Sequence, residues 1–87
     1  MASYELVIKR SVAKDLRGIP KQELKRILRR IHSLSDDPRP AGCEKLSGRE
    51  RYRLRQGMYR VLYEIHDKRV TVVVVKVAKR DIIYRKR

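Results

Sequence analysis

Apolar side chains at the start of the chain first alternate, as in a strand, and the residues after them predict a helix. The alternation from Tyr4 through Leu6 to Ile8 predicts a short strand with these side chains on one face. Serine is favoured at helix N-caps, so Ser11 predicts the start of a first helix of about two turns. Gly18 is placed to end that helix as its C′ glycine.

A second helix gives the clearest periodicity in the sequence. Pro20 stands where this helix would begin, a position that tolerates the missing N–H of proline. Its apolar stripe recurs at three- and four-residue spacing and consists of Leu24, Ile27, Leu28, Ile31 and Leu34. Residues 36–40, which include two prolines, end it. Residues 11–35 are therefore expected to form two helices packed against a flat partner.

The C-terminal half predicts that flat partner as a small sheet. Residues 52–55 alternate apolar and basic side chains, residues 56–58 are a turn, and residues 59–66 alternate again. Residues 67–68 then turn the chain into a nearly continuous valine run over residues 69–78. Such a run is typical of a central strand that is buried on both faces.

Together these elements predict an α+β fold. We expect the N-terminal strand and a two-helix hairpin to pack on a small antiparallel sheet, with the first strand added beside a three-stranded meander. The helices would cover the face that carries Tyr59, Val61, Tyr63 and Ile65, leaving the opposite face open. At 87 residues the chain is expected to be one domain, residues 1–87.

Positive charge is concentrated in the sheet half. Residues 51–87 carry twelve Lys or Arg against three acids, and the whole chain has a formal net charge of +14. A β-rich segment with this excess is expected to bind a polyanion, of which nucleic acid is the commonest. An anionic membrane surface or an acidic protein partner fits the charge as well, whereas an enzyme of neutral metabolites is disfavoured.

Residue types that other chemistries need are scarce. The single Cys43 excludes an intramolecular disulfide and a cysteine-rich zinc site, and His32 and His66 fall in different predicted elements. We therefore expect no metal and no cofactor. The sequence has no apolar stretch near the roughly 20 residues of a membrane helix and no signal-peptide pattern. We expect a cytoplasmic protein that makes no membrane contact.

Three arginines of the predicted sheet are expected together on its open face. Arg53 and Arg55 lie two residues apart on one strand, and the turn brings Arg60 back toward them. Arg80 and Tyr84 follow the valine strand four residues apart, which on a helical turn or tight bend places them on one side. Four guanidinium groups and a phenol would make a phosphate-binding site with a proton-transfer group. These five residues are the candidate catalytic residues.

Plainer interpretations fit the same pattern. A basic strand face is more often a solvated surface or a binding patch without catalysis, and Tyr84 near the C-terminus is by default a packing residue. His66 beside the turn is expected to be a surface residue. Further basic residues are candidates for nucleic-acid binding: Lys45, Arg49, Arg51, Lys76, Lys79 and Arg85.

The order of these motifs resembles the RelE branch of the RelE/ParE toxin family over nearly the whole chain. After the strand and the helical hairpin come Lys45-Leu46-Ser47-Gly48, Tyr52-Arg53-Leu54-Arg55, Gly57-Met58-Tyr59-Arg60-Val61-Leu62-Tyr63 and Arg80-Asp81-Ile82-Ile83-Tyr84. Their order within 87 residues makes the resemblance specific.

The resemblance implies a toxin of a type II toxin–antitoxin pair that cleaves mRNA in the ribosomal A site. Family members attack the phosphate with the RNA 2′-hydroxyl and use no metal. Arg60 and Arg80 would then hold the scissile phosphate, with Arg53 and Arg55 positioning the RNA backbone. Tyr84 would stack on a base, transfer a proton, or both. The implied partners are the ribosome with its mRNA and rRNA, and an acidic cognate antitoxin that wraps the basic sheet.

One departure from the family pattern affects the mechanism. The best-known branch has lysine at the basic pair, where this chain has Arg53 and Arg55. Arginine binds phosphate well but is effectively never deprotonated, so it is a poor general base. That leaves Tyr84 or the ribosome to accept the proton. The alternatives are a non-catalytic inhibitor of DNA gyrase, as in the ParE branch, and an RNA-binding homologue without activity.

Overall fold

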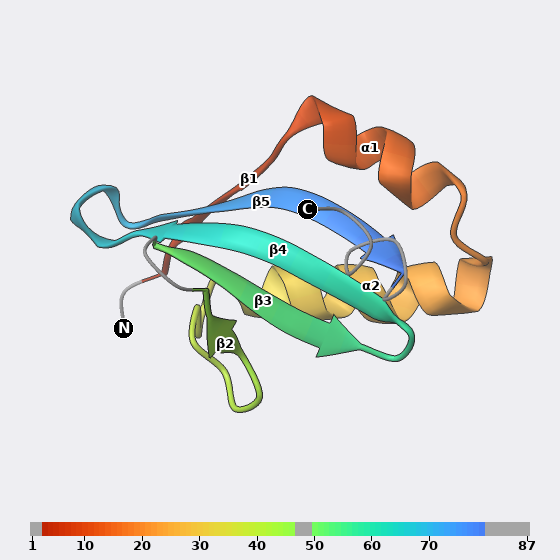
Figure 1. The fold of residues 1–87 in the computed structure, drawn as a ribbon. Coiled ribbons are helices and arrows are strands. Elements are labelled where there is room, and N and C mark those ends of the chain that lie inside the picture. The colour runs from red at the N-terminus through yellow and green to blue at the C-terminus, as the bar shows by residue number, and fades with distance from the viewer. Residues whose placement is uncertain (1–2, 47–49, 80–87) are drawn as a thin grey trace.

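The computed structural model describes residues 3–46 and 50–79, which form two α-helices and one five-stranded sheet (Figure 1). Along the chain the elements are β1 (Glu5–Ile8), α1 (Arg10–Arg17), α2 (Lys21–Ser33), β2 (Glu44–Lys45), β3 (Arg51–Gln56), β4 (Tyr59–His66), the 3-10 helix η1 (Asp67–Arg69) and β5 (Thr71–Lys79). The strands are ordered β1-β5-β4-β3-β2. β1 runs parallel to β5, and every other neighbouring pair is antiparallel.

One core joins the helices to one face of the sheet, which confirms the predicted α+β fold. Ile27 and Ile31 of α2 are fully buried, and Val12 joins them from α1. The sheet contributes the alternate side chains that the pattern predicted: Tyr59, Val61, Tyr63 and Ile65 are all buried in this core. Figure 1 shows α2 lying behind the strands and α1 beside the end of β5. The other face of the sheet carries no helix among the described residues.

The ends of the first helix differ from the prediction. α1 begins at Arg10 and its N-cap is Lys9, so Ser11 lies inside the helix. The Lys9 N–H still donates to the Val74 carbonyl of β5 at 3.2 Å, so pairing with the sheet sets where the helix starts. Gly18 is the C-cap with a φ of −87°, so it does not use the left-handed conformation expected of a C′ glycine. α2 starts directly after Pro20, as expected.

The valine strand is an interior strand, but the expectation that it is buried on both faces was wrong. β5 lies between β1 and β4, and Val72 and Val74 are fully buried under the helices. Val73 and Val75 on the other side are only partly buried because neither of the described α-helices covers that face. An irregularity in the pairing with β4 leaves Val75 without an opposite residue, since Leu62 faces Lys76 while Tyr63 already faces Val74.

An acidic side chain of α1 protects the half of β5 that β1 does not reach. β1 pairs with β5 only as far as Val74. Beyond that point, the Asp15 carboxylate accepts a hydrogen bond from the Val77 backbone N–H at 3.2 Å and another from the Lys76 ammonium at 3.2 Å. An exposed strand edge is a template for pairing with other chains, and this carboxylate caps it.

Candidate nucleic-acid interface

The strand register brings three of the predicted arginines together on the open face of the sheet. Leu54 pairs with Val61, and both face the core. Because side chains alternate along a strand, the next pair along, Arg55 opposite Arg60, faces the other side. Arg53 lies two residues from Arg55 on the same strand and shares that side. The positive φ of Gly57, at 60°, makes the tight turn that joins the two strands.

These arginines line a cavity with two residues from the loop before β3. Gly42 and Glu44 complete the lining beside Arg53, Arg55 and Arg60. The cavity has a volume of about 120 Å³, well above the roughly 10–15 Å³ that a single water requires. Arg60 is only 4% exposed, while the Arg55 side chain lies in solvent. The cavity therefore combines a buried cation with an accessible one and has room for an anionic group.

Glu44 is a member of this cavity that the sequence pattern missed. Its carboxylate accepts a hydrogen bond from Arg53 Nε at 3.2 Å and a second, shorter one from Arg53 Nη2. The hydrogen bond and charge of Arg53, with the charges of Arg55 and Arg60, lower the pKa of the Glu44 carboxyl. Glu44 therefore stays ionised at neutral pH. β2 has only two residues, too few to show an alternation, so the sequence pattern could not place Glu44 on the same face as the arginines.

The cavity contains a pairing of like charges that is unfavourable in an ordinary sheet. Like charges directly opposite each other on neighbouring strands are destabilising, yet Arg55 pairs with Arg60. Among the described residues that line the cavity, three carry a guanidinium group and one, Glu44, carries a carboxylate. An incoming phosphate would relieve that repulsion and gain bidentate hydrogen bonds, the geometry in which arginine binds oxyanions best. Chemically, the arrangement is suited to binding an anion.

The other predicted nucleic-acid-binding residues are dispersed. Arg51 lies on the open face but donates to Glu64 at 2.7 Å. Lys76 forms an ion pair with Asp15. Lys45 contacts Glu50 at 3.3 Å and pairs across the strands with Tyr52, whose side chain faces the core.

Lys79 is exposed at the end of β5. Several predicted residues lie outside the described residues: Arg49, Arg80, Tyr84 and Arg85.

A second polar cluster occupies the open face at the far end of the sheet from the cavity. Glu64 accepts from Arg51, and its second oxygen lies 3.2 Å from His66 Nε2. The Arg51 hydrogen bond is the main cause that lowers the pKa of the Glu64 carboxyl. Over residues 3–46 and 50–79, the structure holds no group of three His, Cys, Asp or Glu side chains able to bind a metal ion. In the same ranges, no helix is long and apolar enough to cross a membrane.

Known structures share this fold. An archaeal RelE–RelB complex from Pyrococcus horikoshii is 31% identical, with a TM-score of 0.82, and the match covers 90% of this chain and 96% of that one. The RelBE2 toxin–antitoxin complex of Mycobacterium tuberculosis is 28% identical, with a TM-score of 0.80, and covers 92% and 94%. Free RelE toxin from E. coli, in a mutant form, is 25% identical, with a TM-score of 0.76, and covers 97% and 93%.

The sequence itself matches a family model. Residues 6–84 match the ParE toxin of the type II toxin–antitoxin system parDE. No protein of curated function matches the chain. The family model spans nearly the whole chain, and the three similar structures named above each contain a RelE toxin. The chain is a RelE-type toxin of the RelE/ParE superfamily, the toxin class of type II toxin–antitoxin systems.

Proposed function

We propose that this toxin is a metal-independent endoribonuclease that cleaves mRNA in the A site of the ribosome. The observation that carries the proposal is the cavity on the open face, where Arg53, Arg55 and Arg60 converge. A cluster of guanidinium groups around a space of this size suits a phosphodiester. Its position on the sheet face that no described helix covers would leave room for an extended RNA strand.

In the proposed reaction the RNA 2′-oxygen attacks the adjacent phosphorus, and the bond from phosphorus to the 5′-oxygen breaks. The products are a 2′,3′-cyclic phosphate and a 5′-hydroxyl. Negative charge grows on the phosphoryl oxygens in the transition state. Arg60 is suited to stabilise it, because a buried cation already in place needs no reorganisation. Arg53 and Arg55 would position the backbone. Arg80 would add a second cation at the phosphate, by the resemblance to the family.

Glu44 is the best placed proton acceptor among the described residues. Attack requires a base to take the 2′-hydroxyl proton, and arginine cannot serve. Glu44 is the one carboxylate among the described residues that line the cavity. Its lowered pKa makes it a weak base, but it keeps the carboxylate in the ionised form that accepts a proton. The 5′-oxygen must gain a proton as it leaves, and Tyr84 is the candidate donor, by the resemblance to the family.

The proposed partners are the ribosome with its mRNA and rRNA, and an acidic antitoxin. The similar complexes from Mycobacterium tuberculosis and Pyrococcus horikoshii each hold a RelE toxin with a RelB antitoxin. We expect an antitoxin of this chain to cover the open basic face of the sheet. A net charge of +14 favours such a partner, since an acidic chain would neutralise the self-repulsion of the free toxin.

A non-catalytic inhibitor of DNA gyrase is the second candidate. The family model that matches the chain describes ParE toxins, which favours this alternative. An inhibitor that works by binding has no need for a buried cation beside a carboxylate in a cavity. The arrangement of Arg60 and Glu44 is therefore better explained by cleavage.

Primer extension on a defined mRNA tests the proposal. The mRNA is incubated with the toxin alone, with programmed ribosomes alone, and with both. We expect cuts inside the A-site codon only when both are present. Intact mRNA, with a folded toxin that blocks DNA supercoiling by gyrase, would establish the second candidate instead.

A further inference from the structure

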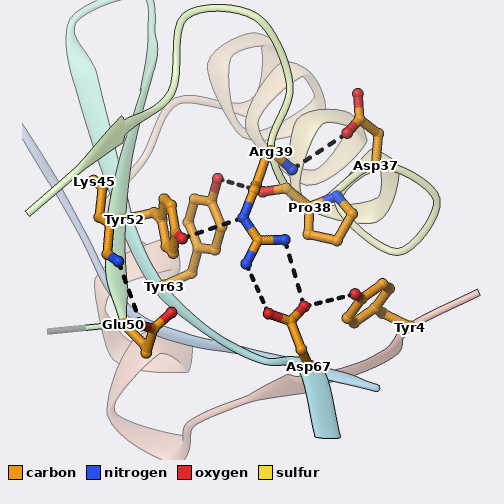
Figure 2. Close-up of polar contacts among 9 residues, drawn as sticks. All are labelled: Tyr4, Asp37, Pro38, Arg39, Lys45, Glu50, Tyr52, Tyr63 and Asp67. Atoms are coloured by element: carbon orange, nitrogen blue, oxygen red, sulfur yellow. Dashed lines mark hydrogen bonds and ion pairs between the residues drawn. The ribbon is translucent and has the colours of Figure 1, made fainter. Parts of the chain in front are cut away.

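Arg39 joins three separate parts of the chain through one guanidinium group. Figure 2 shows it between the ring of Tyr52 and the carboxylate of Asp67. Arg39 Nη2 and Nη1 donate to the two Asp67 oxygens at 2.9 and 3.4 Å, and Nε donates to the Tyr52 hydroxyl at 3.2 Å. Its guanidinium carbon lies 5.4 Å from the centre of the Tyr52 ring, within the range of a cation–π contact. The Tyr4 hydroxyl donates to Asp67 at 2.7 Å.

We call Arg39 with Tyr4, Tyr52 and Asp67 the Arg39 bracket. Asp67 begins the turn between β4 and β5, and Tyr4 precedes β1. The hydrogen bonds from Arg39 and then from Tyr4 lower the pKa of the Asp67 carboxyl. The carboxylate therefore stays charged, and the bracket stays closed, through the neutral range.

Pro38, which precedes Arg39 in the same loop, is held by a side chain of the core. The fully buried Tyr63 donates its hydroxyl proton to the Pro38 carbonyl at 2.8 Å (Figure 2). Burial is the main cause that raises the pKa of the Tyr63 phenol, which keeps it protonated as a donor. Two consecutive loop residues, Pro38 and Arg39, are thus fixed to β3, β4 and the turn after β4.

The fixed point lies immediately before the residues that line the cavity. Three residues separate Pro40 from Glu44, and the Cys43 N–H donates to the Pro40 carbonyl at 3.1 Å. β2 itself pairs with β3 through only two residues, followed by one hydrogen bond from the Leu46 N–H to the Arg51 carbonyl at 2.8 Å. The bracket and Tyr63 therefore hold the loop just before Gly42 and Glu44, and the pairing of β2 with β3 holds it just after Gly42.

We infer that Arg39 and Asp67 are positioning residues that hold Glu44 against the arginines of the cavity. The consequence for RNA cleavage rests on the proposed function, but the positioning itself does not. Arg39 and Asp67 are 42% and 52% exposed in their side chains. Ion pairs this exposed contribute little to stability, so variants at either position are expected to fold.

The first test measures the pKa of Glu44 by carbon-13 NMR of its carboxyl, assigned with Glu44→Gln. We compare the wild type, Arg39→Gln and Lys68→Gln. Lys68 is exposed and follows Asp67 directly, so its variant loses the same charge in the same region. In Arg39→Gln we expect the Glu44 pKa to rise toward its ordinary value, because the loop releases the carboxylate from Arg53. Lys68→Gln should leave it unchanged. A Glu44 pKa that stays low in Arg39→Gln would overturn the inference.

Two further variants separate the bracket from a simple charge effect. Asp67→Asn should raise the Glu44 pKa as Arg39→Gln does, although it changes the net charge in the opposite direction. Arg39→Lys should give an intermediate shift, because one ammonium cannot pair with a carboxylate in a fork and reach Tyr52 as well. An Asp67→Asn variant with the wild-type Glu44 pKa would contradict the bracket.

Cleavage then links the bracket to the reaction. With programmed ribosomes we expect Arg39→Gln to lower kcat by on the order of 10–100-fold, with little change in KM, since a displaced catalytic group costs that much. A wild type that does not cleave, together with the expected pKa response, would contradict the endoribonuclease proposal and leave the positioning inference standing. A cleaving wild type with kcat unchanged in Arg39→Gln would contradict the positioning role.

Discussion

At the scale of single residues, Glu44 has two opposing effects on the cavity. Its carboxylate occupies Arg53 and would repel an incoming phosphate, yet it is the proposed proton acceptor, a role that arginine cannot fill. Binding and chemistry should therefore respond in opposite directions when its charge is removed. Few substitutions separate the two so clearly, because most changes in a phosphate site weaken both.

We predict that Glu44→Gln binds RNA at least as tightly as the wild type but cleaves it more slowly. The amide releases Arg53 for the phosphate, while loss of a general base typically costs about 10²–10⁴-fold in rate. Single-turnover cleavage on programmed ribosomes and anisotropy with a short labelled RNA measure the two effects. Glu50→Gln is the matched control, since Glu50 is exposed and contacts Lys45 rather than the cavity. An equal loss of affinity and rate in Glu44→Gln would contradict the assigned role.

The buried phenol of Tyr63 holds the loop before β2 from within the core. Tyr63→Phe removes its hydrogen bond to the Pro38 carbonyl and leaves that acceptor without this donor. We expect a loss of about 1–2 kcal/mol in the free energy of unfolding, measured by urea denaturation. Tyr63 also stacks on Tyr52, with ring centres 5.8 Å apart, and phenylalanine keeps that contact. An unchanged midpoint and slope would show that the hydrogen bond has no net effect.

At the scale of elements, the meander and the helical stripe were predictable because each repeats a period over many residues. The alternation from Tyr59 to Ile65 fixed which face is buried, and the stripe of α2 fixed its buried side. β2 could not be predicted, since a two-residue strand has no period. Nor could the cap of β5, because the side chain of Asp15 reaches a backbone N–H 62 residues further along the chain.

Replacing Asp15 tests whether its carboxylate protects the edge of β5. Asp15→Ala leaves the Val77 N–H uncapped and Lys76 without its carboxylate. We expect a loss of about 1.5–3 kcal/mol in the free energy of unfolding, the range for a hydrogen bond to a charged group. We also expect self-association through the exposed edge, visible by size-exclusion chromatography. Asp36→Ala, at an exposed loop position, is the control. A stable, unassociated Asp15→Ala protein would contradict the capping role.

At the scale of the whole molecule, the charge of +14 acts differently on the two faces of the sheet. The helices cover one face of the sheet, so the arginines on the other face are placed where an anion could contact them. Charge alone could not distinguish RNA from an acidic protein, because both present the same sign. The convergence of Arg53, Arg55 and Arg60 could be predicted from the alternation of β3 and β4. The contribution of the loop at Glu44 required the structure.

RNA affinity is expected to depend steeply on salt. Each phosphate neutralised on a single strand adds about 0.7 to the slope of log affinity against log salt. Arg55→Gln should therefore lower the slope by about 0.7, whereas Lys68→Gln, at the other end of the sheet, should leave it unchanged. Anisotropy with a short labelled RNA over a series of potassium chloride concentrations measures both. Equal slopes for the wild type and Arg55→Gln would place the phosphate elsewhere.

The rate at which programmed ribosomes and this toxin cut a defined mRNA in the A site tests whether the cavity is the site of cleavage. The comparison is among the wild type, Arg55→Gln and Arg69→Gln. Arg55 and Arg69 are both exposed, but only Arg55 lines the cavity. We predict ribosome-dependent cutting by the wild type and Arg69→Gln, and a loss of about 10-fold or more in Arg55→Gln, because a misplaced RNA backbone costs up to about 100-fold in rate. Equal rates for all three proteins would contradict the assignment of the cavity as the site of cleavage.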